Sequence, residues 1–151
     1  LSEQAMEIKS EILEGLDLSE SGLESPELSM RYGRYLGEWI DFLEQRKDVL
    51  NIVLMQSLKK RGSEEALFSF IEESFQFGVD QYRERYNKEP KNEIEFRIQA
   101  FYMGFMPMMA FVLLRDKWCE HHNLPVSDVQ ESFSRIFFQE YVLDTVNRMF
   151  T

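Results

Sequence analysis

Apolar residues recur along this chain at the spacing of α-helices. Between residues 26 and 45, apolar side chains return every three or four positions from Leu28 to Leu43, and charged side chains occupy the opposite face. This pattern predicts a long amphipathic helix. Ser25 and Pro26 fit its start, because a proline in the first turn lacks only an N–H that would have no partner there. The same spacing predicts helices at residues 5–16 and 63–82, and an almost wholly apolar, buried helix at residues 49–59.

A fifth helix is predicted over about residues 93 to 122. Asn92 and Glu95 have the spacing of a capping box, in which two side chains satisfy backbone N–H groups at a helix start. The central stretch "FYMGFMPMMAFVLL" carries apolar side chains on both sides of the helix, so both sides should be covered by protein. Pro107 removes one backbone hydrogen bond and should bend the helix, leaving room beside it. The residues opposite its main apolar face are Met103, Ala110 and Leu114.

The same uncharged stretch raises the question of a membrane span. A bilayer-spanning helix needs roughly 20 predominantly apolar residues. The interval between Arg97 and Arg115 falls short of that length and contains Gln99. We therefore expect protein around this helix and no contact with a membrane.

The last predicted helix carries two apolar stripes. It starts near Ser127, where Gln130 completes a second capping pattern. The terminal helix of a small bundle has one face to give to its own core, so we expect the second stripe to bind a partner chain, most simply a second copy. The first stripe comprises Val129, Phe133, Ile136 and Leu143, and the second comprises Phe138, Val142 and Met149.

Composition limits the classes of partner. Residues 1–151 are the size of one domain, and their 27 acidic and 17 basic side chains give a formal net charge of −10. Nucleic-acid phosphates repel such a charge, so we expect no direct DNA binding. The single Cys119 excludes an internal disulfide and fits a reducing cytoplasm, and the polar first ten residues contain no signal peptide. The chain opens within a predicted helix, which suggests a fragment of a longer protein.

Catalytic and metal-binding patterns are sparse. Cys119 and His122 are three residues apart, which would allow two ligands on one metal, but a structural zinc site needs four ligands and the sequence has no second pair. The sequence also lacks a P-loop, a dinucleotide fingerprint and a Gly-x-Ser-x-Gly motif. We therefore expect no enzymatic activity, no cofactor and no metal.

The order of the predicted helices resembles the C-terminal domain of TetR-family transcriptional regulators. The best local match is "FYMGFMPMMAFVLLRDKWCEHHNLP" followed by "FFQEYV", which is similar to the last two helices of that domain. The resemblance implies an all-α six-helix bundle, an apolar or amphipathic small-molecule effector, and a homodimer in which the last two helices form a four-helix interface. It implies operator-DNA binding, by a repressor in the cytoplasm, only through a helix-turn-helix head that this sequence lacks.

The resemblance also implies roles for particular side chains, each of which would equally suit an ordinary core. The effector pocket would be lined by Trp39, Met55, Ile71, Phe75, Phe101, Phe105 and Met108. The dimer interface would comprise Leu113, Trp118, Phe137, Phe138, Tyr141 and Val142. Two other interpretations stay open: a helical protein-interaction or structural module without a pocket, and a small-ligand carrier or a helical enzyme.

Overall fold

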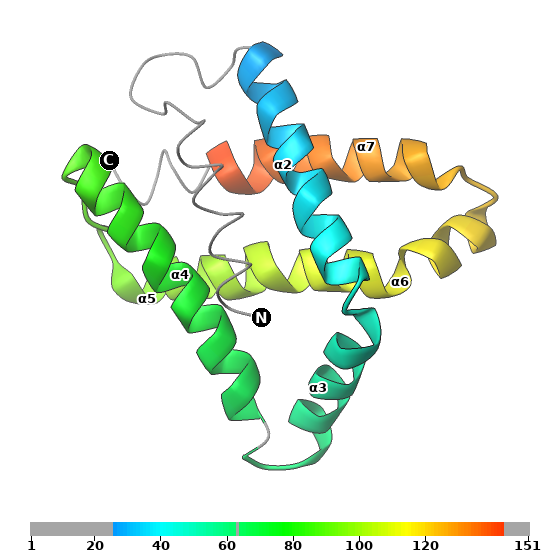
Figure 1. Cartoon of the computed structure of the whole chain (residues 1–151), viewed down its shortest axis with the longest axis horizontal. Helices are drawn as coiled ribbons and strands as arrows, with labels where there is room; N and C mark the ends of the chain where they lie inside the picture. The colour runs from blue at the N-terminus through cyan, green and yellow to red at the C-terminus, as the bar shows by residue number, and fades with distance from the viewer. Residues whose placement is uncertain (1–25, 63, 144–151) are drawn as a thin grey trace.

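The computed structural model describes residues 26–62 and 64–143, and these are helical without any strand (Figure 1). The all-α class is therefore confirmed. The helix predicted at residues 5–16 lies outside the described residues, so the six-helix count stays a prediction. The elements are α2 (Pro26–Glu44), α3 (Lys47–Lys59), α4 (Glu64–Tyr86), α5 (Glu93–Ile98), η1 (Gln99–Phe105), α6 (Met106–His122), α7 (Val126–Phe137) and η2 (Phe138–Leu143).

The predicted fifth helix is present as α5, η1 and α6, which join into one helix of 30 residues, Glu93–His122. Its predicted start is confirmed. The Asn92 side-chain oxygen accepts hydrogen bonds from the backbone N–H groups of Ile94 (3.0 Å) and Glu95 (3.1 Å). At the other end, Asn123 adopts a left-handed conformation with φ of 53°, and the next N–H donates back to the Cys119 carbonyl (2.9 Å). This arrangement satisfies a carbonyl that the helix end would otherwise leave unpaired.

Pro107 is accommodated by a π-helical segment immediately before it. Proline has no N–H to donate to the Met103 carbonyl, four residues earlier. In η1 the hydrogen bonding shifts by one residue, so that the Met106 N–H donates to the Phe101 carbonyl. The shift places Pro107 in the first turn of α6, where a missing N–H costs little. The missing hydrogen bond predicted at Pro107 is thus accommodated by a π segment, and the helix continues through it.

The last predicted helix begins differently from expectation. Its proposed cap, Ser127, does not bond to the backbone of the first turn, and its hydroxyl lies 3.4 Å from the Asp128 carboxylate. The helix starts at Val126, directly after Pro125 in an extended conformation (φ −69°, ψ 133°). Proline fixes its own φ, so it ends the preceding loop without a side-chain cap. The Ser127 cap prediction was wrong for this reason.

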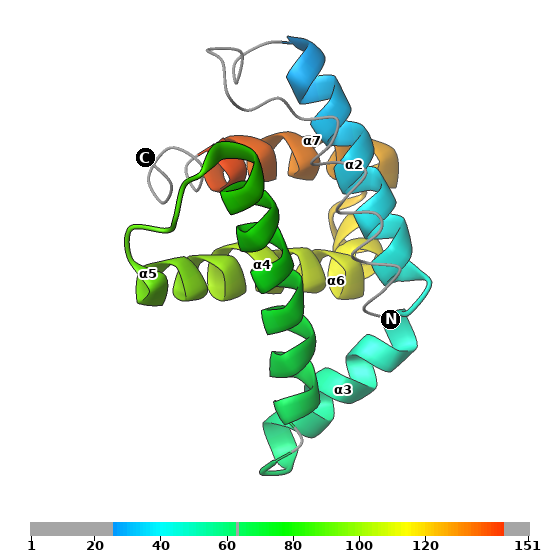
Figure 2. The same ribbon diagram turned by 60° about the vertical axis from the view of Figure 1, so that its left-hand side comes forward.

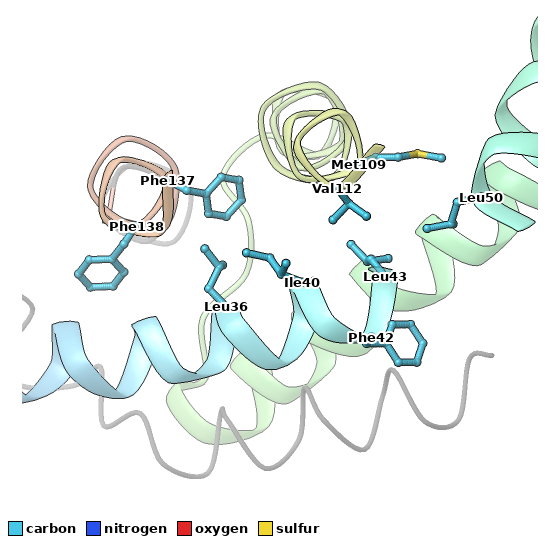
Figure 3. Close-up of a cluster of buried hydrophobic side chains, with 9 residues drawn as sticks. All are labelled: Leu36, Ile40, Phe42, Leu43, Leu50, Met109, Val112, Phe137 and Phe138. Atoms are coloured by element: carbon cyan, nitrogen blue, oxygen red, sulfur yellow. The ribbon is translucent and has the colours of Figure 1, made fainter. Parts of the chain in front are cut away.

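Helix α2 crosses over α6 and α7, which lie side by side and run in opposite directions (Figure 1). Helices α3 and α4 pack together, and α4 also crosses the long helix at η1 (Figure 2). Most of the core fills the space between α2, α6 and α7. Figure 3 shows its buried side chains: Leu36, Ile40, Phe42, Leu43, Leu50, Met109, Val112, Phe137 and Phe138.

The predicted apolar face of α2 is confirmed, since Leu36, Ile40 and Leu43 are buried at spacings of four and three residues. The prediction of a buried helix at residues 49–59 was wrong. Helix α3 packs against α4, but Leu50 is the only buried residue within it. The exposed apolar residues of α3 are Val49, Ile52, Met55 and Leu58.

Candidate interaction groove on α6 and α7

An apolar groove runs between the long helix and α7, on the side of α6 opposite the core. Val112 of α6 is fully buried under α2. Leu114 follows it by two residues, or about 200° around the helix, and is 56% exposed. The helix therefore has an apolar core face and a second apolar face that the described chain leaves open.

The groove has two ends that share a middle formed by Pro107, Phe133 and Ile136. The first end has a volume of about 550 Å³ and is also lined by Glu95, Ile98, Gln99, Met103, Phe137, Glu140 and Tyr141. The second end has a volume of about 640 Å³ and is also lined by Ala110, Phe111, Leu114, Arg115, Trp118, Leu124, Pro125, Asp128, Val129 and Ser132.

Large apolar side chains in both ends are about half exposed. The exposed fraction is 58% for Met103, 49% for Trp118 and 55% for Ile136. Single exposed apolar residues are normal on a protein surface, whereas a contiguous exposed apolar patch marks an interaction site. These residues belong to one continuous groove and therefore form such a patch.

Aromatic rings in contact with one another form the floor of the groove. The rings of Phe111 and Phe133 lie 3.9 Å apart and nearly parallel, joining α6 to α7. Along α7 and η2 the series continues from Phe133 to Phe137 (5.7 Å) and from Phe137 to Tyr141 (5.0 Å). The Tyr141 ring lies so close to Gly104 that a Cβ atom there would be 2.6 Å from it. Glycine at this position lets η2 approach η1.

Arg115, at the second end, ties three helices together. Its side chain is only 11% exposed, and it donates hydrogen bonds to Gln130 of α7 (2.9 Å) and Asp116 (2.9 Å) and pairs with Glu44 of α2 (3.5 Å). The hydrogen bond from Arg115 lowers the pKa of Asp116 below its usual value, and the charges of Arg115 and Lys47 add to this shift. Charge-assisted bonds of this kind hold α6 in register with α2 and α7.

The predicted dimer-interface residues lie partly in this groove. Trp118, Phe137 and Tyr141 line it, although Phe137 is only 7% exposed. Leu113 packs against the core cluster. The side chain of Val142 lies outside the described residues.

The argument that Phe138 needs a partner chain was wrong. Phe138 is 6% exposed, and it is covered within its own chain, where its ring points toward α2 (Figure 3). The open stripe of α7 is the other one, which contains Phe133 and Ile136. Both apolar stripes were visible in the sequence, but which of them α2 covers depends on how the helices cross.

Leu114 and Ile136 line the groove but were not among the predicted interface residues. Each directly neighbours a predicted interface residue, Leu113 or Phe137. One position along a helix corresponds to about 100° around it, so neighbouring side chains point in different directions. The signal for Leu114 was present, because it lies on the second apolar face of the long helix together with Met103 and Ala110.

The structure does not gather the predicted effector-pocket residues around either end of the groove. Trp39, Phe105 and Met108 pack against the core cluster, whereas Met55 is exposed on α3. Phe101 meets Phe68 of α4 edge to face, with ring centroids 5.7 Å apart. Of the other two, Ile71 is buried on α4, and the side chain of Phe75 lies outside the described residues.

A polar cleft of about 500 Å³ lies elsewhere, between α4 and α5. Arg83 donates a hydrogen bond to Glu89 (2.8 Å), and this interaction lowers the pKa of Glu89. Arg97 bonds to Glu93 (2.9 Å) and Glu72 (3.2 Å). These exposed ion pairs fasten the α4–α5 connection but contribute little free energy each.

No group of three metal-ligating side chains occurs within residues 26–62 and 64–143. Cys119 is buried, and the ring of His122 lies 4.4 Å from that of Trp118. Cys119 therefore belongs to the packing at the end of α6, whereas His122 is exposed there.

No family model, curated protein or solved structure matches this chain. The resemblance to TetR-family regulators thus stays a prediction.

Proposed function

We propose that this chain is an association domain that pairs with a second copy of itself through the groove on α6 and α7. The observation that carries the proposal is the exposed apolar face on a helix whose opposite face buries Met109 and Val112 in the core. Two antiparallel helices from each copy would form a four-helix bundle, the geometry in which such faces cover one another. A second copy would present an equally apolar face to the groove, as a twofold-symmetric interface requires.

A membrane is a weaker candidate for the occupant of the groove. The helix Glu93–His122 is long and apolar enough to cross a bilayer by length and composition. However, Met109 and Val112 in its centre are fully buried against the rest of the chain. Inserting this helix into lipid would require pulling it out of the core, which would expose to water the apolar side chains of α2 that it covers, such as Leu36 and Ile40. The formal charge of −10 also opposes binding to anionic lipid surfaces.

In the proposed role the domain belongs to a transcriptional regulator of the TetR-like type. The helix order and the apolar face on the last two helices support this proposal. Pairing of two such domains would place two DNA-binding heads, carried by a longer protein, at a fixed spacing. A fixed spacing is what a symmetric operator with two half-sites requires.

Effector binding is a second candidate function, supported by the junction between α4 and η1. These elements meet through edge contacts of aromatic rings, Phe68 with Phe101 and Phe70 with Phe105 (6.5 Å). Phe101 and Phe105 belong to the π segment η1, and π segments often occur at functional sites. In a thermal-shift screen of apolar compounds, a true effector should stabilise wild type, and Phe105→Ala should weaken that effect while leaving the helix content unchanged. Compounds that stabilise both proteins equally would contradict binding at this junction.

The pairing is tested by sedimentation velocity over a micromolar concentration series. Wild type should be a dimer, whereas Leu114→Glu should be a folded monomer, because it places a charge in the centre of the apolar contact. The matched control is Leu58→Glu on α3, where the leucine is 74% exposed and lies far from the groove. A wild-type monomer, or a monomer that binds phosphatidylcholine vesicles, would overturn the proposal.

A further inference from the structure

We propose that the π segment η1 sets the rotation of α5 relative to α6, so that Glu95 lines the same groove as Leu114 and Trp118. Pro107, which excludes a regular α-helix here, is then a positioning residue for the groove. This inference rests on the proposed function for the use of the groove, whereas the rotation itself is a property of one chain.

Helical spacing shows why a regular α-helix would not build this groove. Successive residues of an α-helix are about 100° apart, so Pro107, Leu114 and Trp118 lie within about 40° of one another. All three line the second end of the groove. Glu95 precedes Pro107 by 12 residues, which in a regular α-helix would place it about 120° away. Glu95 nevertheless lines the first end together with Pro107.

The π segment accounts for this difference. A π segment contains one residue more than the α-helix it replaces, so it takes about 100° off the rotation between its two flanks. In η1 the extra residue is evident from the hydrogen bond that the Met106 N–H donates to the Phe101 carbonyl. The rotation that remains between Glu95 and Pro107 is about 20°. Both ends of the groove therefore belong to one face of the long helix.

Pro107 keeps the segment in the π arrangement. In a regular α-helix its ring would clash with the Met103 carbonyl, which would also lack a donor. The π segment avoids this conflict, because it places Pro107 in the first turn of α6. The proline thus fixes which side of α5 faces the groove, although it lies outside α5.

The other π segment lies at the same end of the groove. The first end is lined by Gln99 and Met103 of η1 and by Glu140 and Tyr141 of η2. Tyr141 lies against Gly104, whose missing Cβ atom leaves room for the ring. π segments are rare and occur frequently at functional sites. Within residues 26–62 and 64–143, both π segments contribute to this end.

Deleting one residue tests the alignment. Without Met103, the segment should become a regular α-helix whose two flanks keep their present rotation. Pro107 would then lie inside that helix, so the deletion alone should lower the melting temperature by about 10 °C. Adding Pro107→Ala should recover most of this loss. Pro107→Ala without the deletion completes the double-mutant cycle, and its own effect should be smaller than the recovery.

The matched control is a deletion of Leu114 in the Pro107→Ala background. Met103 and Leu114 are similarly exposed, at 58% and 56%. Leu114 lies in regular α6, so its deletion rotates the following turns by about 100° and moves the buried Cys119 out of the core. This control should lose its cooperative thermal transition in circular dichroism. Equal tolerance of the two deletions, or no recovery by Pro107→Ala, would overturn the proposal.

A crosslink tests the groove itself. Glu95 and Glu140 line the first end from α5 and η2. Cysteines at both positions should be joined within one chain by a short bis-maleimide, both in wild type and in the Met103 deletion with Pro107→Ala. Chains without these cysteines control for the native Cys119, which is 1% exposed. Absence of the crosslink in either folded protein would contradict the alignment.

The outcomes separate the alignment from the proposed function. Melting and a crosslink within one chain do not require association. A wild-type monomer in sedimentation would therefore overturn the association domain and leave the alignment intact. A wild-type dimer that tolerates both deletions equally would overturn the alignment and leave the association domain intact.

Discussion

The two faces of the α6–α7 pair have similar composition and opposite surroundings. On the inner face, Met109 and Val112 are fully buried against α2, and Phe137 is nearly so. On the outer face, Leu114 and Ile136 are more than half exposed although they are equally apolar. Apolar composition alone therefore does not define the core of a small helical domain. The core is the face that another element of the same chain happens to cover.

The largest expected effect is on the inner face. Met109→Ala removes a fully buried side chain and leaves a cavity among α2, α3 and α6, so it should lower the free energy of unfolding by about 2–5 kcal/mol. Urea denaturation followed by circular dichroism measures this loss. Ala110→Gly is not a suitable control, because glycine itself weakens a helix. Met103→Ala on the outer face is the matched control. An equal loss of unfolding free energy in this variant would contradict the distinction between the faces.

Gly104 connects the two faces through Tyr141. In Gly104→Ala the new Cβ atom would lie 2.6 Å from the tyrosine ring, so η2 must shift, and we expect a loss of about 1–3 kcal/mol in unfolding free energy. Removing the ring should relieve the clash. In a double-mutant cycle, Gly104→Ala should therefore cost much less in a Tyr141→Ala background than in wild type. An unchanged cost would show that the two residues are not coupled.

The adjacent pair Leu113 and Leu114 gives the sharpest comparison. Leu113 packs against the core cluster, so Leu113→Ala should destabilise the fold by about 1–3 kcal/mol. Leu114→Ala should change the stability of the monomer by less than about 0.5 kcal/mol, because the side chain is largely exposed there. It should instead raise the dimer dissociation constant. Unfolding measured at protein concentrations below and above the dimer dissociation constant separates the loss of monomer stability from the loss of dimer affinity.

Much of this architecture was predictable from spacing alone. The long amphipathic helix from Pro26, the start of the fifth helix at Asn92 and the disturbance at Pro107 each follow from local chemistry that acts within one or two turns. Which of Leu113 and Leu114 packs against the core was not predictable in this way. It depends on the angle at which α2 crosses, which is set by contacts between residues some 70 positions apart in sequence.

The candidate pocket could not be derived from local pattern for a related reason. A methionine and phenylalanine stripe has the same composition whether it fills a core or lines a cavity. Phe105 and Met108 pack against the core cluster, and the groove lies on the other side of the helix.

The smallest expected effect concerns acid. The pKa of Asp116 is lowered in the folded state, chiefly by the hydrogen bond from Arg115, from an ordinary value of 3.8. The folded state therefore binds this proton less readily than the unfolded state, and Asp116 contributes stability above pH 3.8 that is lost as the pH falls through its lower folded value. Asp116→Asn should lower the melting temperature slightly at pH 7, and this difference should be smaller at pH 2. A constant difference between the two proteins at both pH values would contradict this assignment.

Trp118 provides the most direct measurement of whether a second copy covers the outer face. It lines the groove and is 49% exposed in a single chain. In Trp39→Phe it is the only tryptophan, so its fluorescence reports on the groove alone. If the groove is the dimer interface, acrylamide should quench Trp118 strongly at nanomolar concentration and weakly at tens of micromolar, with the transition at the dissociation constant found by sedimentation. Equal quenching at every concentration, in a protein that sedimentation shows to be dimeric, would contradict the central claim, because the dimer would then form through another surface.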